Sequence, residues 1–301
     1  MSVFVIAEAG VNHNGSVERA LQLVEVAARC GADAVKFQTF SAAKLVTRGA
    51  AKAEYQKAAT GQGDQYDMLR ALELDEAAHR ALFARCTELG IEFMSTPFDV
   101  EAAAFLVGLG MRRLKIPSGE ITNEPFLESL AATGRPLILS TGMADMAEIR
   151  RAVEVIGAAR PARSAADLVV LHCTSNYPTR AQDANLRAMT TIAAETGLPV
   201  GYSDHTLGIN VALAAVALGA TVIEKHFTLD RSLPGPDHAA SLEPADLRRM
   251  VEGIREVESA LGSPLKAPVA AELPVRDVAR RSVTLLRDVA AGARLEAADL
   301  G

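Results

Sequence analysis

Short apolar runs rich in β-branched residues alternate with longer Ala- and Leu-rich stretches along most of the chain. Apolar runs of about four to eight residues are typical of buried strands, and the longer stretches are typical of helices. The short runs predict strands at residues 3–8, 34–38, 91–95, 113–117, 136–140, 168–172, 199–203 and 221–227. The longer stretches predict helices at residues 17–30, 75–89, 99–109, 123–133, 145–158, 185–196, 208–218 and 243–261.

Eight strand–helix units within about 260 residues predict an α/β fold, the (β/α)8 TIM barrel. The alternative is an open, doubly wound sheet, which usually has fewer strands and often carries G-x-G-x-x-G after the first strand. Here the first strand continues into EAGVNHNG (8–15), which does not match that motif. The pattern therefore favours the barrel.

Two regions fall outside the alternation. The connection at residues 40–74 is polar and contains glycine, which predicts an active-site loop with some helix. Residues 263–280 contain several prolines and predict a linker, and residues 281–301 predict a strand, a turn and a short helix. We expect a catalytic barrel at 1–262, this linker, and the start of a second module that is too small to hold a core alone.

The composition narrows the possible partners. The chain has 301 residues, of which 49% are hydrophobic, but aromatics are 4% and Trp is absent, so Val, Leu, Ile and Ala must fill the core. The net charge of −6 leaves no basic surface for nucleic acid, and we expect no nucleic-acid partner. Small anionic substrates would have to be held by local Lys and Ser groups.

The lack of a recognisable signal peptide and the pattern of cysteines both predict a cytoplasmic protein. The N-terminus has no basic region and Glu8 interrupts its apolar run, so it does not resemble a signal peptide. The longest apolar run, 211–223, is shorter than the roughly 18–20 residues that span a bilayer. Cys30, Cys86 and Cys173 form no CxxC pair, which suits reduced thiols. We expect a soluble cytoplasmic protein without a membrane partner.

The last two predicted strands carry a pair of histidines. Residues two apart in a strand share a face, so Glu224 points the same way as His226, and Ser203 the same way as His205. If these strands are parallel neighbours, the two imidazoles lie at the same end of the sheet and suit a divalent metal with open positions. Taken alone, the pair favours two histidines satisfied in the core or at the surface, and only the rest of the chain reverses that preference.

Nearly every predicted strand ends in a hydrogen-bond donor, a carboxylate or a potential metal ligand, at the end of a barrel where active sites are built. These residues are Glu8, Lys36, Gln38, Thr96, Lys115, Ser118, Glu120, Ser140, Ser175, Asn176, Tyr177, Ser203, Asp204, His205, Glu224, His226 and, in the following loop, Asp237. Each alone has a plain structural explanation as a helix cap or a solvated strand end. Their occurrence on successive strands indicates a catalytic site.

Two groups within this set could bind anions. A lysine supplies a point charge and hydroxyls supply donors, so the following residues could jointly bind a phosphate: Lys115, Ser118, Ser140 and Ser203. Lys36 with Thr96 could hold a second anionic group such as a carboxylate. A substrate that carries both groups would fit this pair of sites.

Eight motifs in order resemble the sialic acid synthase family, whose members condense phosphoenolpyruvate with an N-acylated amino sugar. They are IAEAGVNHNGS (6–16), KFQTF (36–40), STPFD (95–99), KIPSGE (115–120), LSTGM (139–143), HCTSNYPT (172–179), GYSDHTLG (201–208) and EKHFTLDRSLPGPDH (224–238). The resemblance covers roughly residues 3–262. A single motif such as LSTGM would be weak, but eight in order are specific.

The resemblance implies roles for the matching positions. It implies that His205 and His226 ligate a divalent metal, Mn²⁺ or alternatively Mg²⁺ or Co²⁺. It implies a phosphate site made of Lys115, Ser118, Ser140, Ser175 and Ser203, and a carboxylate site made of Lys36 and Thr96. Some relatives have Asn in place of Ser175, and Asn176 is its alternative here. The residues implied to face the sugar and the reacting carbons are Glu8, Gln38, Glu120, Tyr177 and Asp237.

The implied reaction is a transfer that gives a nonulosonic acid and phosphate. N-acetylmannosamine is the favoured acceptor, and the alternative is a 2,4-diacetamido trideoxy sugar that would give N,N'-diacetyllegionaminic acid. Glu8 or Glu120 would stabilise the cation at carbon 2 or accept the proton of water. Two less favoured hypotheses are a Schiff-base aldolase with Lys36 or Lys115 as nucleophile, and a non-catalytic sugar-binding protein.

The C-terminal segment also resembles part of this family. Full-length relatives end in a small antifreeze-like (SAF) domain that, in a homodimer, covers the partner's active site and delivers an arginine to the sugar. Residues 281–301 resemble the truncated start of that domain, and the segment that would carry the arginine lies beyond Gly301. The resemblance therefore implies a homodimer.

Overall fold

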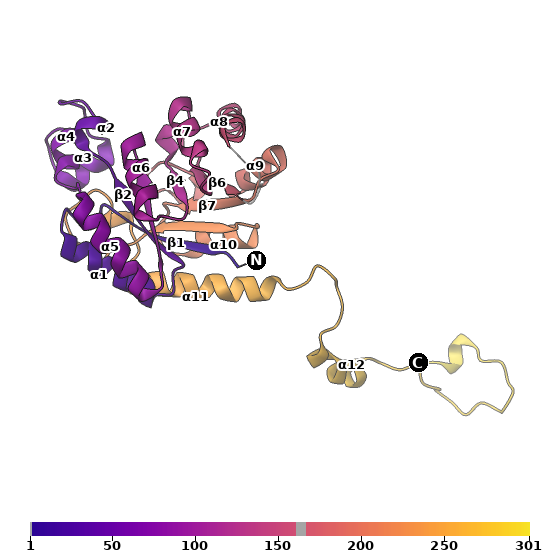
Figure 1. The fold of residues 1–301 in the computed structure, drawn as a ribbon. Coiled ribbons are helices and arrows are strands. Elements are labelled where there is room, and N and C mark those ends of the chain that lie inside the picture. Colours follow the sequence, from indigo (N-terminus) through magenta and orange to yellow (C-terminus); the bar gives the residue numbers. More distant parts are fainter. Residues whose placement is uncertain (1, 161–166) are drawn as a thin grey trace. The chain divides into compact units, whose positions relative to one another are not determined.

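The computed structural model describes residues 2–160 and 167–301 of the chain. They belong to two compact units, Met1–Leu261 and Gly262–Gly301. The first unit contains a parallel sheet and the helices that cover it, with the strands at the centre (Figure 1). The second is a short segment around α12 (Leu273–Ala279).

Eight parallel strands form the sheet, in the order β3-β2-β1-β8-β7-β6-β5-β4. Their bounds are β1 Phe4–Gly10, β2 Ala34–Thr39, β3 Glu92–Pro97, β4 Leu114–Ile116, β5 Leu137–Ser140, β6 Leu168–Cys173, β7 Val200–Asp204 and β8 Val222–His226. The first and last strands of this order, β3 and β4, also contact one another, so the sheet curls into a nearly closed barrel. The (β/α)8 barrel predicted from the sequence is confirmed, with all eight strands in the predicted places.

Helices follow the strands and pack around the outside of the barrel (Figure 1). They are α1 Val17–Arg29, α5 Glu76–Leu89, α6 Val100–Leu109, α7 Glu124–Ala132, α8 Met146–Ala159, α9 Ala188–Thr196, α10 Asn210–Ala217 and α11 Pro244–Leu261. Each lies within a few residues of its predicted position. Among the described residues, none of the helices is long and apolar enough to cross a membrane.

Capping residues explain where several helices begin and end. The side chains of Asp75, Asp99 and Asp145 each accept a backbone N–H in the first turn of α5, α6 and α8. At the other end of α5 and α6, Gly90 and Gly110 adopt the left-handed conformation that glycine reaches without steric cost. These local signals place the helices so that their apolar faces meet the barrel.

Alternation along the strands divides the barrel interior into layers. Inside the barrel, a separate apolar cluster is made of Ile6, Ala34, Met94, Ile138, Leu171 and Val222. Because the side-chain period of a strand is two, the next inward-facing residue on each of these strands is fixed. Those residues are Glu8, Lys36, Thr96, Ser140, Cys173 and Glu224. A closed apolar floor therefore lies directly beneath a layer of mainly polar and charged side chains.

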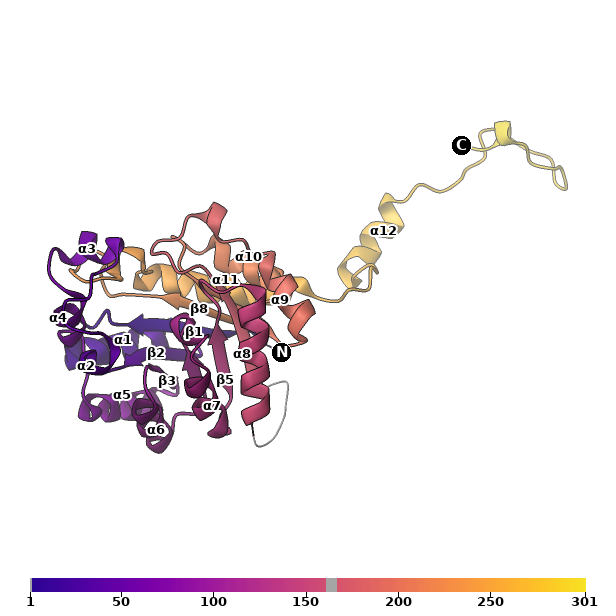
Figure 2. The same ribbon diagram turned by 90° about the horizontal axis from the view of Figure 1, so that it is seen from above.

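The long connection after β2 contains three further helices, α2 Ala42–Leu45, α3 Glu54–Thr60 and α4 Gln65–Arg70. The prediction of a loop with some helix is confirmed. The three helices lie together beside the barrel in both views (Figure 1 and Figure 2). A small apolar cluster of Val11, Phe40 and Leu72 anchors this connection next to the first strand.

The C-terminal unit differs from the sequence prediction. The predicted linker contains α12, and where a strand was predicted the described residues show only an isolated antiparallel bridge between Leu285 and Leu300. The predicted short helix is a single 3₁₀ turn, Ala297–Asp299. A strand needs a neighbour to satisfy its backbone, and this short segment supplies little more than that bridge. Its relation to an antifreeze-like domain stays a prediction.

Candidate active site

A cavity of about 400 Å³ opens at the carboxyl ends of the strands, above the apolar floor. Its lining includes the predicted residues Glu8, Lys36, Gln38, Thr96, Lys115, Ser118, Ser140, Ser175, Tyr177, Ser203, His205 and His226. Residues without a predicted role also line it, namely Ala53, Phe98, Pro117, Gly119, Met143, Cys173 and Glu224. The structure therefore brings together residues from all eight strands and from the connections that follow them.

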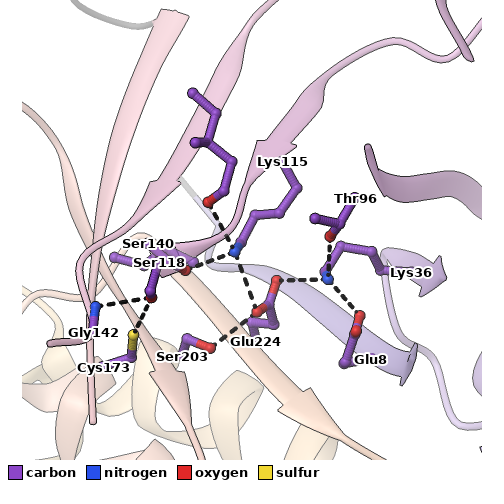
Figure 3. Close-up of polar contacts among 12 residues, drawn as sticks. Glu8, Lys36, Thr96, Lys115, Ser118, Ser140, Gly142, Cys173, Ser203 and Glu224 are labelled. Carbon is purple, nitrogen blue, oxygen red and sulfur yellow. Dashed lines mark hydrogen bonds and ion pairs between the residues drawn. The ribbon is translucent and has the colours of Figure 1, made fainter. Parts of the chain in front are cut away.

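Charges of opposite sign alternate along the layer of side chains at the bottom of this cavity, directly above the apolar floor (Figure 3). Lys36 Nζ lies 2.7 Å from Glu8 Oε2 and 3.6 Å from Glu224 Oε2. Lys115 Nζ lies 3.7 Å from the other oxygen of Glu224. All four side chains are almost completely buried, so their charges interact strongly and compensate one another.

The two carboxyl groups of this row have very different acidities. Burial raises the pKa of Glu8 to about 7, with the neighbouring charge of Glu224 acting in the same direction and Lys36 opposing it. Burial also disfavours ionised Glu224, but Lys115 and Lys36 outweigh that effect and lower its pKa to about 2. Glu8 can therefore exchange a proton near neutral pH while Glu224 stays ionised, a division typical of acid–base sites.

Each lysine also contacts a hydroxyl. Lys36 Nζ donates to Thr96 Oγ1 at 2.9 Å, and Lys115 Nζ donates to Ser140 Oγ at 2.6 Å. Burial alone would lower the pKa of Lys36, but Glu224 and Glu8 outweigh it and the pKa is raised. Each lysine–hydroxyl pair offers a cation and a neutral donor to an anion.

Gly142 makes room for a cradle of hydroxyls near Lys115. Its backbone N–H donates to Ser118 Oγ at 2.9 Å. A Cβ at this position would collide with Ser175 Oγ and lie 2.9 Å from Ser118 Oγ. Only glycine therefore leaves room for the hydroxyls of Ser118 and Ser175 at this place. The donors suit a phosphate group.

The two predicted metal ligands lie at the ends of the neighbouring strands β7 and β8. His205 directly follows β7 and His226 ends β8, with ring centroids 5.6 Å apart. Nδ1 of His205 lies 2.7 Å from the carbonyl oxygen of Thr174. A carbonyl only accepts, so this nitrogen carries the proton and Nε2 keeps its lone pair, with Ser203 Oγ 3.5 Å away. Nδ1 of His226 is buried and has no hydrogen-bond partner among the described residues.

These histidines fit a divalent metal. Burial lowers the pKa of His205 and, together with His205 and Lys36, holds the pKa of His226 well below its usual value, so both rings are neutral. The neutral imidazole is the form that binds metals, and a metal-binding histidine usually donates its other ring N–H to a carbonyl or carboxylate, as His205 does to Thr174. Within residues 2–160 and 167–301 no three His, Cys, Asp or Glu side chains group around one point. An ion here would take its remaining ligands from water or substrate.

Of the residues to which the resemblance gives a definite role, Asp237 and Glu120 lie outside the lining of the cavity. Asp237 is buried, its Oδ2 lies 3.8 Å from His226 Nδ1, and burial raises its pKa to about 6. Glu120 ends the 3₁₀ turn Ser118–Glu120, where its Oε2 accepts a hydrogen bond from Asn123 Nδ2 at 2.7 Å. Asp237 therefore lies beside His226 without a hydrogen bond to it, whereas Glu120 is turned toward the start of α7.

The NeuB family model matches residues 23–266 of this chain. The chain belongs to the NeuB family. The N,N'-diacetyllegionaminic acid synthase of Legionella pneumophila is 55% identical over 100% of this chain and 85% of its own length. The N-acetylneuraminate-9-phosphate synthase of Mus musculus is 36% identical over 97% of this chain and 80% of its own length. A solved N-acetylneuraminic acid synthetase from Leptospira borgpetersenii, 35% identical, superposes with a TM-score of 0.80 and covers 94% of each chain. The resemblance to sialic acid synthases is confirmed.

Glu224 is the main feature of this NeuB site that sequence reasoning missed. Its shared face with His226 was recognised, but no role followed from that. A stronger signal was available, because Glu224 comes two residues after the inward-facing Val222 and pairs in register with Ser203. Its Oε1 accepts a hydrogen bond from Ser203 Oγ at 2.9 Å. A carboxylate at an inward position of a barrel strand is itself an indication of function.

Proposed function

We propose that this NeuB-family chain condenses phosphoenolpyruvate with an N-acetylated amino sugar and water, giving a nonulosonic acid and inorganic phosphate. The observation that supports it best is the pair of lysine–hydroxyl sites, Lys36 with Thr96 and Lys115 with Ser140. Two separate anion sites in one pocket suit a small molecule with a carboxylate and a phosphate. The names of the relatives, which are synthases of such acids, support the same conclusion.

The two anion sites would fix phosphoenolpyruvate in one orientation. The phosphate would lie on Lys115 and the hydroxyls of Ser118, Ser140, Ser175 and Ser203. The carboxylate would lie between Lys36 and Thr96. Holding both ends leaves carbon 3 of the enol facing the open part of the pocket, and this pre-orientation lowers the entropic part of the barrier.

Glu8 is the residue that we assign to proton transfer. Carbon 3 forms a bond to the sugar aldehyde carbon, whose oxygen takes up a proton, and positive charge develops at carbon 2. Water adds to carbon 2 and releases one proton, which leaves a hydroxyl group there. The bond from carbon 2 to the phosphate oxygen then breaks, the hydroxyl proton goes to the departing phosphate, and the keto acid forms. Glu8, with a pKa of about 7, can donate and accept these protons, and ionised Glu224 can stabilise the charge at carbon 2.

His205 and His226 would hold a divalent metal, for which Mn²⁺ is our first choice and Mg²⁺ or Co²⁺ the alternatives. Such an ion would polarise the aldehyde as a Lewis acid. The tautomer of His205 set by Thr174 and the unpartnered nitrogen of His226 support this assignment. Asp237, close to His226, would help to orient that ring.

For the acceptor we propose a 2,4-diacetamido trideoxy sugar rather than N-acetylmannosamine. Two relatives named N,N'-diacetyllegionaminic acid synthase, from Legionella pneumophila and Campylobacter jejuni, are 55% and 46% identical to this chain. The N-acetylneuraminate-9-phosphate synthases of mouse and human are each 36% identical. The anion and metal sites serve either sugar, so this choice rests on the relatives alone.

The deciding experiment measures phosphate release from phosphoenolpyruvate with Mn²⁺ and a panel of both kinds of sugar. We expect release with the diacetamido sugar, weaker release with N-acetylmannosamine, and loss of both after chelation. Release only with N-acetylmannosamine would overturn the acceptor assignment. No release with any sugar would favour a sugar-binding protein, and a covalent adduct trapped by borohydride would favour a Schiff-base aldolase.

We also propose a homodimer, on the basis of the family resemblance. The C-terminal unit exposes apolar side chains, with Leu265 and Val283 76% exposed and Val278 88% exposed. Covering such side chains in a second copy would remove apolar surface from water. Light scattering of the chain at micromolar concentration tests this, and a monomeric mass would contradict it.

A further inference from the structure

Behind the two histidines, the outer face of the same strands carries a buried ion pair. Asp204 and Lys225 are direct cross-strand neighbours of β7 and β8. Because side chains alternate along a strand, they point away from the cavity that His205 and His226 face. Each member of the pair directly precedes one of the two histidines.

The pair makes a dense set of hydrogen bonds. Lys225 Nζ lies 2.7 Å from Asp204 Oδ2 and also donates to the carbonyl oxygen of Thr206. The other oxygen of Asp204 accepts from the backbone N–H and the hydroxyl of Thr206, both at 2.8 Å. The side chains of Lys225 and Asp204 are 1% and 0% exposed. The pair therefore joins β8 to the three-residue segment 204–206.

The fold itself does not require charges at this place. The residues beside them on the same outward face, Tyr202, Ile223 and Phe227, are fully buried and mainly apolar. A buried ion pair is often no more stabilising than apolar side chains of similar volume, because both charges lose their hydration. The pair therefore calls for an explanation other than stability.

The contacts around His205 supply an explanation for the buried ion pair. Its backbone carbonyl accepts a hydrogen bond from the N–H of Thr179 at 2.8 Å, and its ring donates to Thr174. The ion pair holds the same segment from the other side, through Thr206, and ties it to the residue before His226. We propose that Asp204 and Lys225 are positioning residues that fix the separation of the two histidines for a divalent cation. This inference rests on the metal site of the proposed function.

The test compares Mn²⁺ affinity in variants of the full chain without substrate, measured by the electron paramagnetic resonance signal of free Mn²⁺. The decisive variant is Asp204→Asn with Lys225→Met, in which Asn still accepts from Thr206 but the bond between the strands is lost. We expect Mn²⁺ binding about 10- to 100-fold weaker, as for other residues that orient metal ligands. His205→Ala removes one of the two metal-binding histidines, so its Mn²⁺ affinity is the value expected when the site is lost.

A matched control lies on the outer face of two other strands. Ser95 Oγ and Thr39 Oγ1 are 2.7 Å apart, and Thr39 Oγ1 is 2.8 Å from His79 Nε2. Ser95→Ala removes a buried hydroxyl far along the sheet from the histidines. We expect it to lower the thermal midpoint and to leave Mn²⁺ affinity unchanged. A merely structural role for the ion pair would give the double variant the same behaviour.

Three outcomes are therefore separable. A folded double variant that binds Mn²⁺ as tightly as wild type overturns this inference and leaves the proposed function intact. Wild type that binds Mn²⁺ no better than His205→Ala overturns the metal site and this inference together. If the double variant does not fold, Lys225→Met alone is measured, since Asp204 keeps both hydrogen bonds from Thr206. We expect at least about fivefold weaker binding from it, and unchanged affinity would overturn the inference.

Discussion

At the scale of single residues, the different acidities of Glu8 and Glu224 depend on how many lysines lie near each carboxyl group. Glu8 has one lysine neighbour at 2.7 Å, whereas Glu224 lies between two lysines at 3.6 and 3.7 Å. The second lysine is enough to keep Glu224 ionised while Glu8 takes up protons near pH 7. Either lysine without its carboxylate would leave an uncompensated buried charge.

Glu8→Gln should lower kcat by about 100-fold or more, because the amide cannot exchange the proton that the reaction requires. Binding of phosphoenolpyruvate should persist, since Lys36 and Lys115 remain. Glu120→Gln is the matched control and should stay near wild type, because Glu120 faces Asn123. Phosphate release and calorimetric binding report the two effects separately. Loss of activity in Glu120→Gln with retained activity in Glu8→Gln would reverse our assignment.

Gly142→Ala should weaken phosphoenolpyruvate binding by about 10-fold or more without unfolding the barrel. The added methyl group would occupy the space among Ser118 Oγ, Ser175 Oγ and the backbone N–H. Gly119→Ala is a suitable control in the same pocket, because a Cβ there meets no atom within 4 Å. The KM for phosphoenolpyruvate distinguishes the two variants. An equal KM in both would show that the cradle does not hold the phosphate.

At the scale of elements, the period of two within strands made most of the site predictable. Lys36, Thr96 and Ser140 line the cavity, because inward-facing apolar residues precede each by two positions. Glu120 lies outside that lining, since the chain turns into a 3₁₀ helix at Ser118 and the alternation ends there. The partners of long side chains, such as the two lysines of Glu224, depend on strand neighbours that one sequence does not reveal.

The turn between β1 and α1 should make stability depend on pH through His13. Nδ1 of His13 accepts the backbone N–H of Gly15 at 3.0 Å, and the ring is 1% exposed. Burial, with the nearby charges of His79 and Arg19, lowers its pKa to about 4. An unfolded histidine titrates near about 6.5, so between these values the unfolded chain binds more protons and stability falls as pH falls.

His13→Asn should remove this dependence, because an amide oxygen can still accept from Gly15 but does not titrate. The free energy of unfolding of wild type should fall between pH 7 and pH 5 by roughly 2 kcal/mol more than that of the variant. Urea denaturation at the two pH values measures the difference. Parallel losses in the two proteins would contradict a neutral buried His13.

At the scale of the whole molecule, the chain is one large unit and one small one. All three apolar clusters lie within Met1–Leu261, so the barrel holds its core without help from Gly262–Gly301. The small unit begins at Gly262, directly after α11, and prolines follow in the sequence. Its internal structure was not predictable, since apolar runs in so short a segment have no sheet or helix to pack on.

A chain cut after Leu261 should therefore fold with a thermal midpoint within about 3 °C of the full chain, a change of roughly 1 kcal/mol for this size. The C-terminal half of α11 must remain, because Arg255 donates to the carbonyl oxygen of Val3 and pairs with Asp33, each at 2.7 Å. A cut after Glu252 is the control: it removes Arg255 and the fully buried Ile254, and should lower the midpoint by far more. Thermal unfolding followed by circular dichroism measures both. Equal destabilisation by the two cuts would mean that the small unit contributes to the barrel's stability after all.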